Sequence, residues 1–162
     1  MFDPKTTDLA TAVLAVCRVR GWRLATAESC TGGLVTAALT AIPGASDVVE
    51  SGFVTYSNEA KMALLGVPEA TLTAAGAVSA EATRAMAAGA VSRAGVDLAV
   101  SITGVAGPGG GSAEKPVGLV YIGIATKESC RSERHVFPGD RDDVRHAAMI
   151  RALEMLKETA AS

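Results

Sequence analysis

Ala27-Glu28-Ser29-Cys30-Thr31-Gly32-Gly33 is the stretch from which we predict the fold, because it joins a strand to a helix through one polar turn. Residues 22–26 are predicted to form a short strand, and residues 31–42 are predicted to form a helix. A helix start presents unpaired backbone N–H groups and a partial positive charge. We therefore expect a site for a phosphate, a carboxylate or an oxyanion, with Ser29 at its mouth. The alternative is that Ser29 or Thr31 only caps the helix.

The rest of the chain alternates helical and strand-like segments. Capping residues and glycine or proline breaks bound the other predicted helices, which cover about residues 3–20, 57–65, 69–75, 79–94 and 140–156. Runs rich in β-branched and other apolar residues predict strands over residues 48–56, 97–103, 117–126 and 131–137. The last two strands are joined through residues 127–129, which predicts a hairpin.

This order of elements predicts an α/β fold, a three-layer α/β/α single domain with a mixed β-sheet over residues 1–162. The terminal hairpin adds antiparallel strands to a partly parallel core. Ligand sites in such sheets lie beyond the carboxyl ends of the strands. We expect the three polar turns after Ala27, Tyr56 and Thr103 to converge there on one pocket.

Composition limits the partners that we expect. The chain is 49% hydrophobic and 20% charged with a net charge of −2, and its 15 Lys and Arg residues are dispersed, so no nucleic-acid partner is expected. No apolar run reaches about 20 residues and no signal pattern begins the chain, so we expect a cytoplasmic protein without a membrane partner. Three cysteines and two histidines at wide spacing predict reduced thiols, no metal and no cofactor. The alanine-rich residues 79–94 predict close packing and leave open a homo-oligomer.

Four stretches carry a resemblance to a known family: residues 26–33 (TAESCTGG), 52–61 (GFVTYSNEAK), 76–79 (GAVS) and 104–108 (GVAGP). In this order and spacing they closely resemble the CinA C-terminal domain family, and the likeness extends over about residues 7–156. That family includes bacterial nicotinamide-nucleotide amidases, which hydrolyse nicotinamide mononucleotide to nicotinate mononucleotide and ammonia. The resemblance implies the same fold and the same small-molecule nucleotide substrate, in a metal-free serine mechanism.

The resemblance also implies catalytic roles. Ser29 would be the nucleophile, with Lys61 and Tyr56 handling its proton. A lysine acts as a base only if burial or nearby positive charge lowers its pKa, and we expect the helix start and a bound pyridinium to help. Backbone N–H groups near Cys30 and Thr31 would hold the oxyanion.

The other substrate-binding residues that we expect lie in three segments of the chain: Gly32 and Gly33 in the first turn, Thr103, Gly104, Gly107 and Gly109 in the third, and Arg141 and Arg145 on the last helix. Backbone N–H groups of residues 107–111 could form a nest for the phosphate, with one of the two arginines. Many family members carry an acidic residue in place of Gly109. Alternatively, this loop is only a flexible entry to the hairpin, and the arginines are a solvated helix face.

Other interpretations concern the chemistry and the function. Cys30 is a rival nucleophile, because a thiolate at a helix start can have a lowered pKa. Glu28 is expected to hold the turn through backbone amides, and His135 or His146 could assist a nucleophile. The alternatives to the nucleotide amidase are a nucleotide-binding module linked to competence or DNA damage, and an amidase for another small amide.

Overall fold

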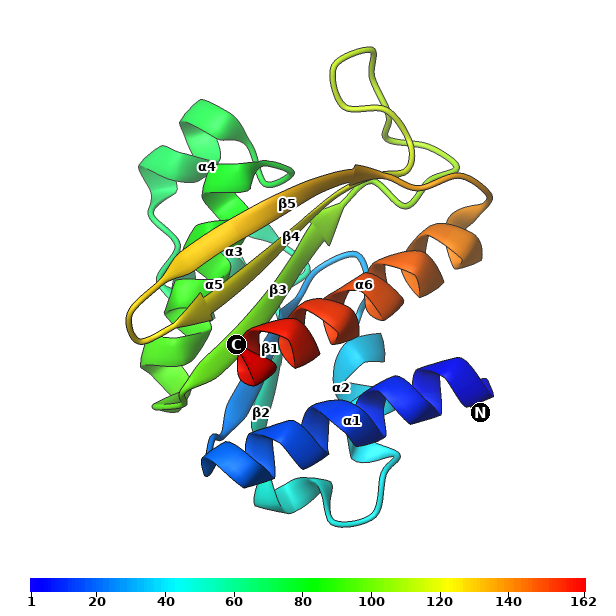
Figure 1. Cartoon of the computed structure of the whole chain (residues 1–162). Coiled ribbons are helices and arrows are strands. Elements are labelled where there is room, and N and C mark those ends of the chain that lie inside the picture. The colour runs from blue at the N-terminus through cyan, green and yellow to red at the C-terminus, as the bar shows by residue number, and fades with distance from the viewer.

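A five-stranded mixed sheet forms the middle layer of the computed structural model, which describes residues 1–162 (Figure 1). The strands lie in the order β2-β1-β3-β4-β5. β1 is parallel to both β2 and β3, while β4 is antiparallel to β3 and β5. Their bounds are β1 (Leu24–Glu28), β2 (Val49–Val54), β3 (Leu98–Gly104), β4 (Leu119–Thr126) and β5 (Cys130–Val136). The predicted α/β fold with a mixed sheet is confirmed.

Helices cover both faces of the sheet. The bounds are α1 (Pro4–Arg20), α2 (Leu34–Thr40), the short 3-10 helix η1 (Ala45–Asp47), α3 (Asn58–Leu65), α4 (Glu69–Ala75), α5 (Ala80–Ala94) and α6 (Arg141–Ala161). Helices α1, α2 and α6 form one outer layer, and α3, α4 and α5 form the other (Figure 1). None of the helices combines the length and apolarity needed to cross a membrane.

The two faces of the sheet differ in the size of their side chains. Along β3, Leu98, Val100 and Ile102 belong to the larger core beneath α1, α2 and α6, whereas Ala99 belongs to the core beneath α5. This alternation is the two-residue period of a strand that is covered on both faces. The small residues let α5 approach closely, since a Cβ at Gly123 would lie 2.7 Å from the Thr83 carbonyl oxygen. The alanine-rich helix α5 therefore packs closely, as predicted, and it does so against the sheet of its own chain.

Most predicted helix ends are confirmed by their caps. Asp3 caps α1 by accepting a hydrogen bond from the Thr6 N–H, and Ser57 and Ser79 cap α3 and α5. Asp140 forms the predicted capping box at the start of α6. These side chains satisfy N–H groups that have no partner within a helix.

The first turn differs from the prediction. β1 covers Leu24–Glu28 and not residues 22–26, and α2 begins at Leu34 and not at Thr31. Gly33 is the N-cap of α2 and has no side chain, and neither Ser29 nor Thr31 accepts a hydrogen bond from the helix start through its hydroxyl, so capping by Ser29 or Thr31 is wrong. Gly32 and Gly33 have φ angles of 60° and 102°, which side-chain-bearing residues rarely adopt, and they extend the turn past the expected helix start.

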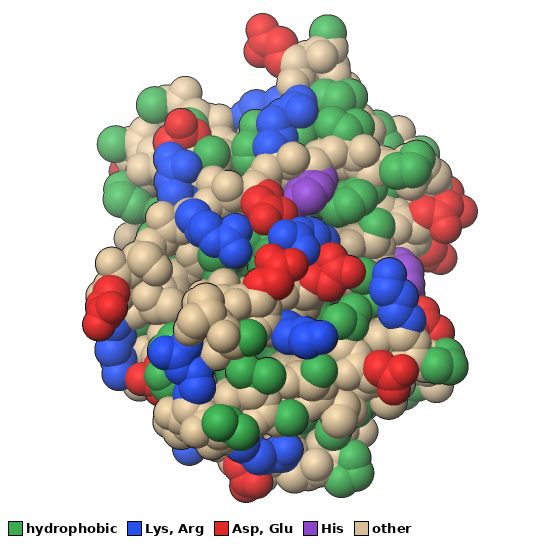
Figure 2. All heavy atoms as spheres, viewed as in Figure 1, with side chains coloured by type: hydrophobic (Ala, Val, Ile, Leu, Met, Phe, Trp, Pro, Cys, Tyr) green, Lys and Arg blue, Asp and Glu red, His purple; other side chains and the backbone are tan.

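Charge is mixed over the face shown in Figure 2. Lys and Arg side chains alternate there with Asp and Glu side chains, with no continuous basic area on that face. Among the ion pairs of the structure, Arg151 pairs with both Glu133 and Glu158.

Candidate active site

Ser29 is the first residue after β1, at the carboxyl edge of the parallel strands. Its N–H donates to the Ile102 carbonyl at 2.9 Å, and its carbonyl accepts a hydrogen bond from the Gly32 N–H at 3.0 Å. The neighbouring turn is joined to it, because the Thr55 N–H donates to the Glu28 carbonyl at 2.9 Å. The carboxyl ends of β1, β2 and β3, from which the three predicted turns start, are therefore joined at this edge, and Ser29 is 9% exposed.

Lys61 extends from α3 toward Ser29 and is only 1% exposed. Its Nζ lies 3.0 Å from Ser29 Oγ, 2.8 Å from the Thr55 carbonyl oxygen and 3.4 Å from the Tyr56 carbonyl oxygen. A neutral amine has two N–H bonds and one lone pair. The two carbonyls can accept both N–H bonds, which leaves the lone pair for the Ser29 hydroxyl proton. The arrangement suits a base beside a nucleophile.

Burial lowers the pKa of Lys61 below its usual value. No carboxylate pairs with Lys61, and only the charge of the neighbouring Cys30 opposes the effect of burial on the Lys61 pKa. The expected lowering of the Lys61 pKa thus has burial as its cause. Sequence analysis missed the hydrogen bond from Lys61 to Thr55, because the acceptor is a main-chain carbonyl, which every residue type has.

Glu28 holds the turn through backbone amides, as predicted. Its carboxylate is fully buried and accepts hydrogen bonds from the Gly33 and Val35 N–H groups at 3.0 and 3.1 Å. The other carboxylate oxygen accepts from the N–H and the hydroxyl of Thr36, both at 2.9 Å. The start of α2 is thereby neutralised within the chain, and the expectation of an open helix terminus there is wrong.

Only two backbone N–H groups between residues 29 and 37 remain free of a protein acceptor. They belong to Cys30 and Thr31, because every other amide in this segment donates to a carbonyl or to Glu28. They are the two that we expected to bind an oxyanion.

Tyr56 lies differently from the prediction. Its side chain is 61% exposed, and its hydroxyl accepts a hydrogen bond from Arg141 Nη2 at 3.1 Å. The hydroxyl forms no hydrogen bond with Ser29 or Lys61, and only the backbone carbonyl of Tyr56 contacts Lys61. The exposed Tyr56 ring therefore lies at the rim of the site, and its hydroxyl makes no hydrogen bond with Ser29.

Arg141 and Arg145 are one turn apart on α6 and each is tied to a different turn of the site. Arg145 donates to the carbonyls of Cys30 and Thr31 at 3.1 and 3.2 Å. Arg141 donates to the Gly107 carbonyl at 2.8 Å as well as to Tyr56. The interpretation of these arginines as a merely solvated helix face is wrong.

The third turn combines fixed and free groups. The Thr103 hydroxyl is buried and donates to the Ala77 carbonyl at 2.9 Å, and a Cβ at Gly104 would lie 2.7 Å from the Leu119 carbonyl oxygen. Thr103 thus joins the end of β3 to the segment that contains Ala77, and Gly104 allows β3 to lie close to β4. Gly109 stands in open space, and the N–H groups of residues 109–111 donate to no protein acceptor. The loop therefore retains donors for an anion.

The rival nucleophile is disfavoured. Cys30 is buried, and burial raises the pKa of its thiol to about 11. His135 pairs with Glu133 and His146 pairs with Asp3, so neither histidine assists Ser29 or Cys30. No group of three or more His, Cys, Asp or Glu side chains is placed to hold a metal ion.

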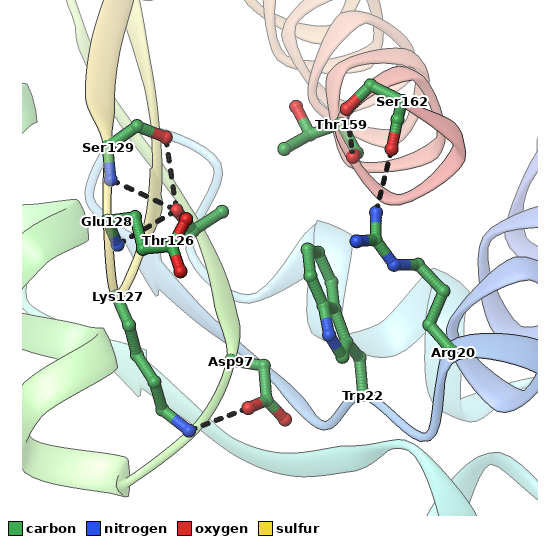
Figure 3. A pocket seen from close by; sticks show the side chains of 9 residues that line it. All are labelled: Arg20, Trp22, Asp97, Thr126, Lys127, Glu128, Ser129, Thr159 and Ser162. Carbon is green, nitrogen blue, oxygen red and sulfur yellow. Dashed lines mark hydrogen bonds and ion pairs between the residues drawn. The ribbon is translucent and has the colours of Figure 1, made fainter.

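Two of the cavities of the structure lie at opposite edges of the sheet. One of about 550 Å³ opens beside Arg141, between Pro108 and Asp142, at the same edge as Ser29. The other, of about 490 Å³, surrounds Trp22 and Asp97, where β1 and β3 begin (Figure 3). It is lined mainly by polar side chains and lies away from Ser29.

The sequence is similar to known proteins. Residues 6–160 match the CinA C-terminal domain. A CinA-like protein from Geobacter sulfurreducens is 50% identical over 147 residues, which are 91% of this chain and 36% of that protein. A CinA-like protein from Citrifermentans bemidjiense is 48% identical over 157 residues, which are 97% of this chain and 38% of that protein. The chain thus spans little more than a third of these curated relatives.

Solved structures share the whole fold. The competence/damage inducible protein CihA from Agrobacterium tumefaciens is 43% identical, with a TM-score of 0.96 over 100% of this chain and 99% of that chain. A competence-damaged protein (CinA) superfamily protein from Escherichia coli is 33% identical, with a TM-score of 0.92 over 100% of this chain and 94% of that chain.

Proposed function

Since the chain belongs to the CinA C-terminal domain family, we propose that it is a serine amidase that hydrolyses nicotinamide mononucleotide to nicotinate mononucleotide and ammonia. The observation that carries the reaction type is the buried Lys61 amine, 3.0 Å from Ser29 Oγ. The substrate follows from the resemblance of the four sequence stretches.

In the first proposed step, Ser29 Oγ attacks the carboxamide carbon and the Lys61 amine takes the hydroxyl proton. The carbonyls of Thr55 and Tyr56 then stabilise the ammonium group that forms. Negative charge on the carboxamide oxygen is received by the free N–H groups of Cys30 and Thr31, and each well-placed donor contributes about 3–4 kcal/mol to the transition state.

In the second step, the Lys61 ammonium returns its proton to the amide nitrogen, and ammonia leaves as the C–N bond breaks. A water molecule then attacks the ester on Ser29, with Lys61 again accepting the proton. Collapse of this intermediate returns the proton to Ser29 Oγ and releases nicotinate mononucleotide. The net reaction consumes one water and forms one ammonia.

For the phosphate we propose Arg141 together with the glycine-rich loop. Arg141 already contacts Gly107, and the free N–H groups of residues 109–111 follow in the same loop. Arg145 is bound to the turn that carries Ser29, and its proposed role is to brace that turn. The exposed ring of Tyr56 beside Arg141 would form a wall for the pyridine ring.

The test measures ammonia release from nicotinamide mononucleotide by the wild type and by Ser29→Ala, with nicotinamide riboside as the substrate that lacks phosphate. We expect Ser29→Ala to lose at least about a thousandfold in kcat, and the riboside to show a strongly reduced kcat/KM. EDTA should leave the rate unchanged, because the proposed steps use only side chains and backbone amides.

Other outcomes select the alternatives. If the wild type binds the nucleotide in calorimetry but releases no ammonia, the chain is a nucleotide-binding module. If the riboside reacts as well as the nucleotide, the phosphate site is wrong and the chain is an amidase for another small amide.

A further inference from the structure

We infer that Glu28 is a positioning residue of this site, which fixes the nucleophile and the oxyanion donors without touching substrate; the inference rests on the proposed function. Glu28 precedes Ser29 directly and is 0% exposed. Its charge is paired with no cation, and all the hydrogen bonds that its side chain accepts come from one short segment, residues 33–36.

These hydrogen bonds occupy the N–H groups at the start of α2 that would otherwise be available to bind an anion. The Gly33, Val35 and Thr36 amides all donate to Glu28, so α2 offers them to no ligand. The Cys30 and Thr31 amides lie in the loop between the carboxylate and the helix that it binds. Because both ends of this loop are held, the two free N–H groups have a fixed place in the turn.

The main chain of Glu28 also helps to position Lys61, the proposed base, through Thr55. Its carbonyl accepts a hydrogen bond from the Thr55 N–H, and the Thr55 carbonyl accepts one from Lys61 Nζ. Glu28 therefore connects three parts of the site: the nucleophile that follows it, the donor turn that it binds and the residue that orients Lys61.

The substitution Glu28→Gln tests this role at constant size. A glutamine amide has one acceptor oxygen, so its NH₂ group must face N–H donors that the carboxylate now accepts. We expect the turn to lose its fixed geometry while the sheet remains folded. The matched control is Glu81→Gln, the same change at an exposed glutamate in the first turn of α5, whose side chain has no partner.

The measurement is the rate at which a fluorophosphonate probe modifies Ser29. The serine oxygen bonds to phosphorus, fluoride leaves, the proton passes to Lys61, and the phosphoryl oxygen takes the oxyanion position, so the rate reports the donor turn whatever the natural substrate is. We expect labelling of Glu28→Gln to be at least about a hundredfold slower than that of the wild type, and Glu81→Gln to stay within threefold. Circular dichroism and thermal unfolding establish that each variant is folded.

A second measurement needs no substitution at Glu28. Amide hydrogen exchange of the wild type should be slow at Gly33, Val35 and Thr36, whose N–H groups donate to Glu28, and exchange at the buried Cys30 and Thr31, which lack a protein acceptor, should become slower when the probe occupies Ser29. Unchanged exchange at Cys30 and Thr31 after labelling would overturn the inference, even if Glu28→Gln fails to fold.

The outcomes separate this inference from the proposed substrate. Equal labelling rates for the wild type and folded Glu28→Gln overturn the role of Glu28. Rapid labelling of the wild type, slow labelling of Glu28→Gln and no ammonia from nicotinamide mononucleotide support that role and overturn the substrate. A wild type that the probe does not label overturns both.

Discussion

Lys61 Nζ lies 3.0 Å from Ser29 Oγ although the two residues are 32 positions apart in the chain. Because burial lowers the pKa of Lys61 below 10.5, we expect kcat/KM to rise with pH along a limb whose apparent pKa lies below that of a free lysine. Lys61→Met should remove this limb and lower kcat by about 10²–10⁴-fold. Steady-state rates between pH 6 and pH 10 measure both effects.

Lys61→Arg is the control, since it keeps the positive charge, on a longer side chain, but offers no lone pair. It should be as inactive as Lys61→Met at every pH. An unchanged limb in either variant would exclude Lys61 as the base.

The pH dependence of the stability of the wild type provides a second readout of the Lys61 pKa. Between the lowered pKa and 10.5 the unfolded chain binds more protons at Lys61, so this residue's contribution to the free energy of unfolding should rise with pH there, and the difference in stability between the wild type and Lys61→Met should show that rise.

Tyr56 is expected to act through its ring and its contact with Arg141. Tyr56→Phe removes the hydroxyl that accepts from Arg141 but keeps the ring, so kcat should fall by less than about fivefold. Tyr56→Ala should raise KM by about tenfold or more, because the wall for the pyridine is lost. A hundredfold loss of kcat in Tyr56→Phe would instead show that the Tyr56 hydroxyl takes part in proton transfer.

Cys30 should not replace Ser29 as a nucleophile. The pKa of its thiol is about 11, so the sulfur stays protonated up to about pH 10. Ser29→Ala, with Cys30 intact, should therefore show no turnover at any pH from 6 to 10. Turnover that appears in Ser29→Ala at alkaline pH and disappears in Ser29→Ala/Cys30→Ala would contradict this expectation.

Gly89→Ala is predicted to destabilise the protein, against the usual preference of helices for alanine. Gly89 lies in α5, and a Cβ there would overlap the carbonyl oxygen of Leu65 at the end of α3. Alanine normally stabilises a helix interior by about 1 kcal/mol relative to glycine. Because backbone must move to admit the methyl group, we expect a net loss of about 1–3 kcal/mol in the free energy of unfolding.

Denaturant titration of Gly89→Ala measures this loss. The exposed Ser92 in the same helix offers the control Ser92→Ala, which should be neutral or slightly stabilising. A stabilised Gly89→Ala would mean that α3 and α5 can separate at little cost.

Local signals in the sequence were sufficient for much of the fold. The caps Asp3, Ser57 and Ser79 and the capping box at Asp140 lie beside the helices that they begin, so their chemistry is visible in short windows. The turns at the carboxyl ends of β1, β2 and β3 were predictable from strand order, because parallel strands end at one edge.

The rest depended on contacts that residue types do not reveal. The start of α2 was placed too early because a carboxylate in the preceding strand, Glu28, binds the amides that would otherwise continue the helix. The two acceptors beside Lys61 are main-chain carbonyls, which every residue has. The hydroxyl of Tyr56 turns toward Arg141, 85 positions away, and tertiary packing alone sets that direction.

Arg145 reaches the carbonyls of Cys30 and Thr31 from more than 110 positions later in the chain. Synthesis proceeds from the N-terminus, so the serine emerges from the ribosome long before the arginine that braces its turn. In the nascent protein, the turn that carries Ser29 therefore lacks the hydrogen bonds from Arg145 until α6 has been translated and has packed. If the proposed activity requires this turn to be held in place, it should therefore depend on the last helix of the chain.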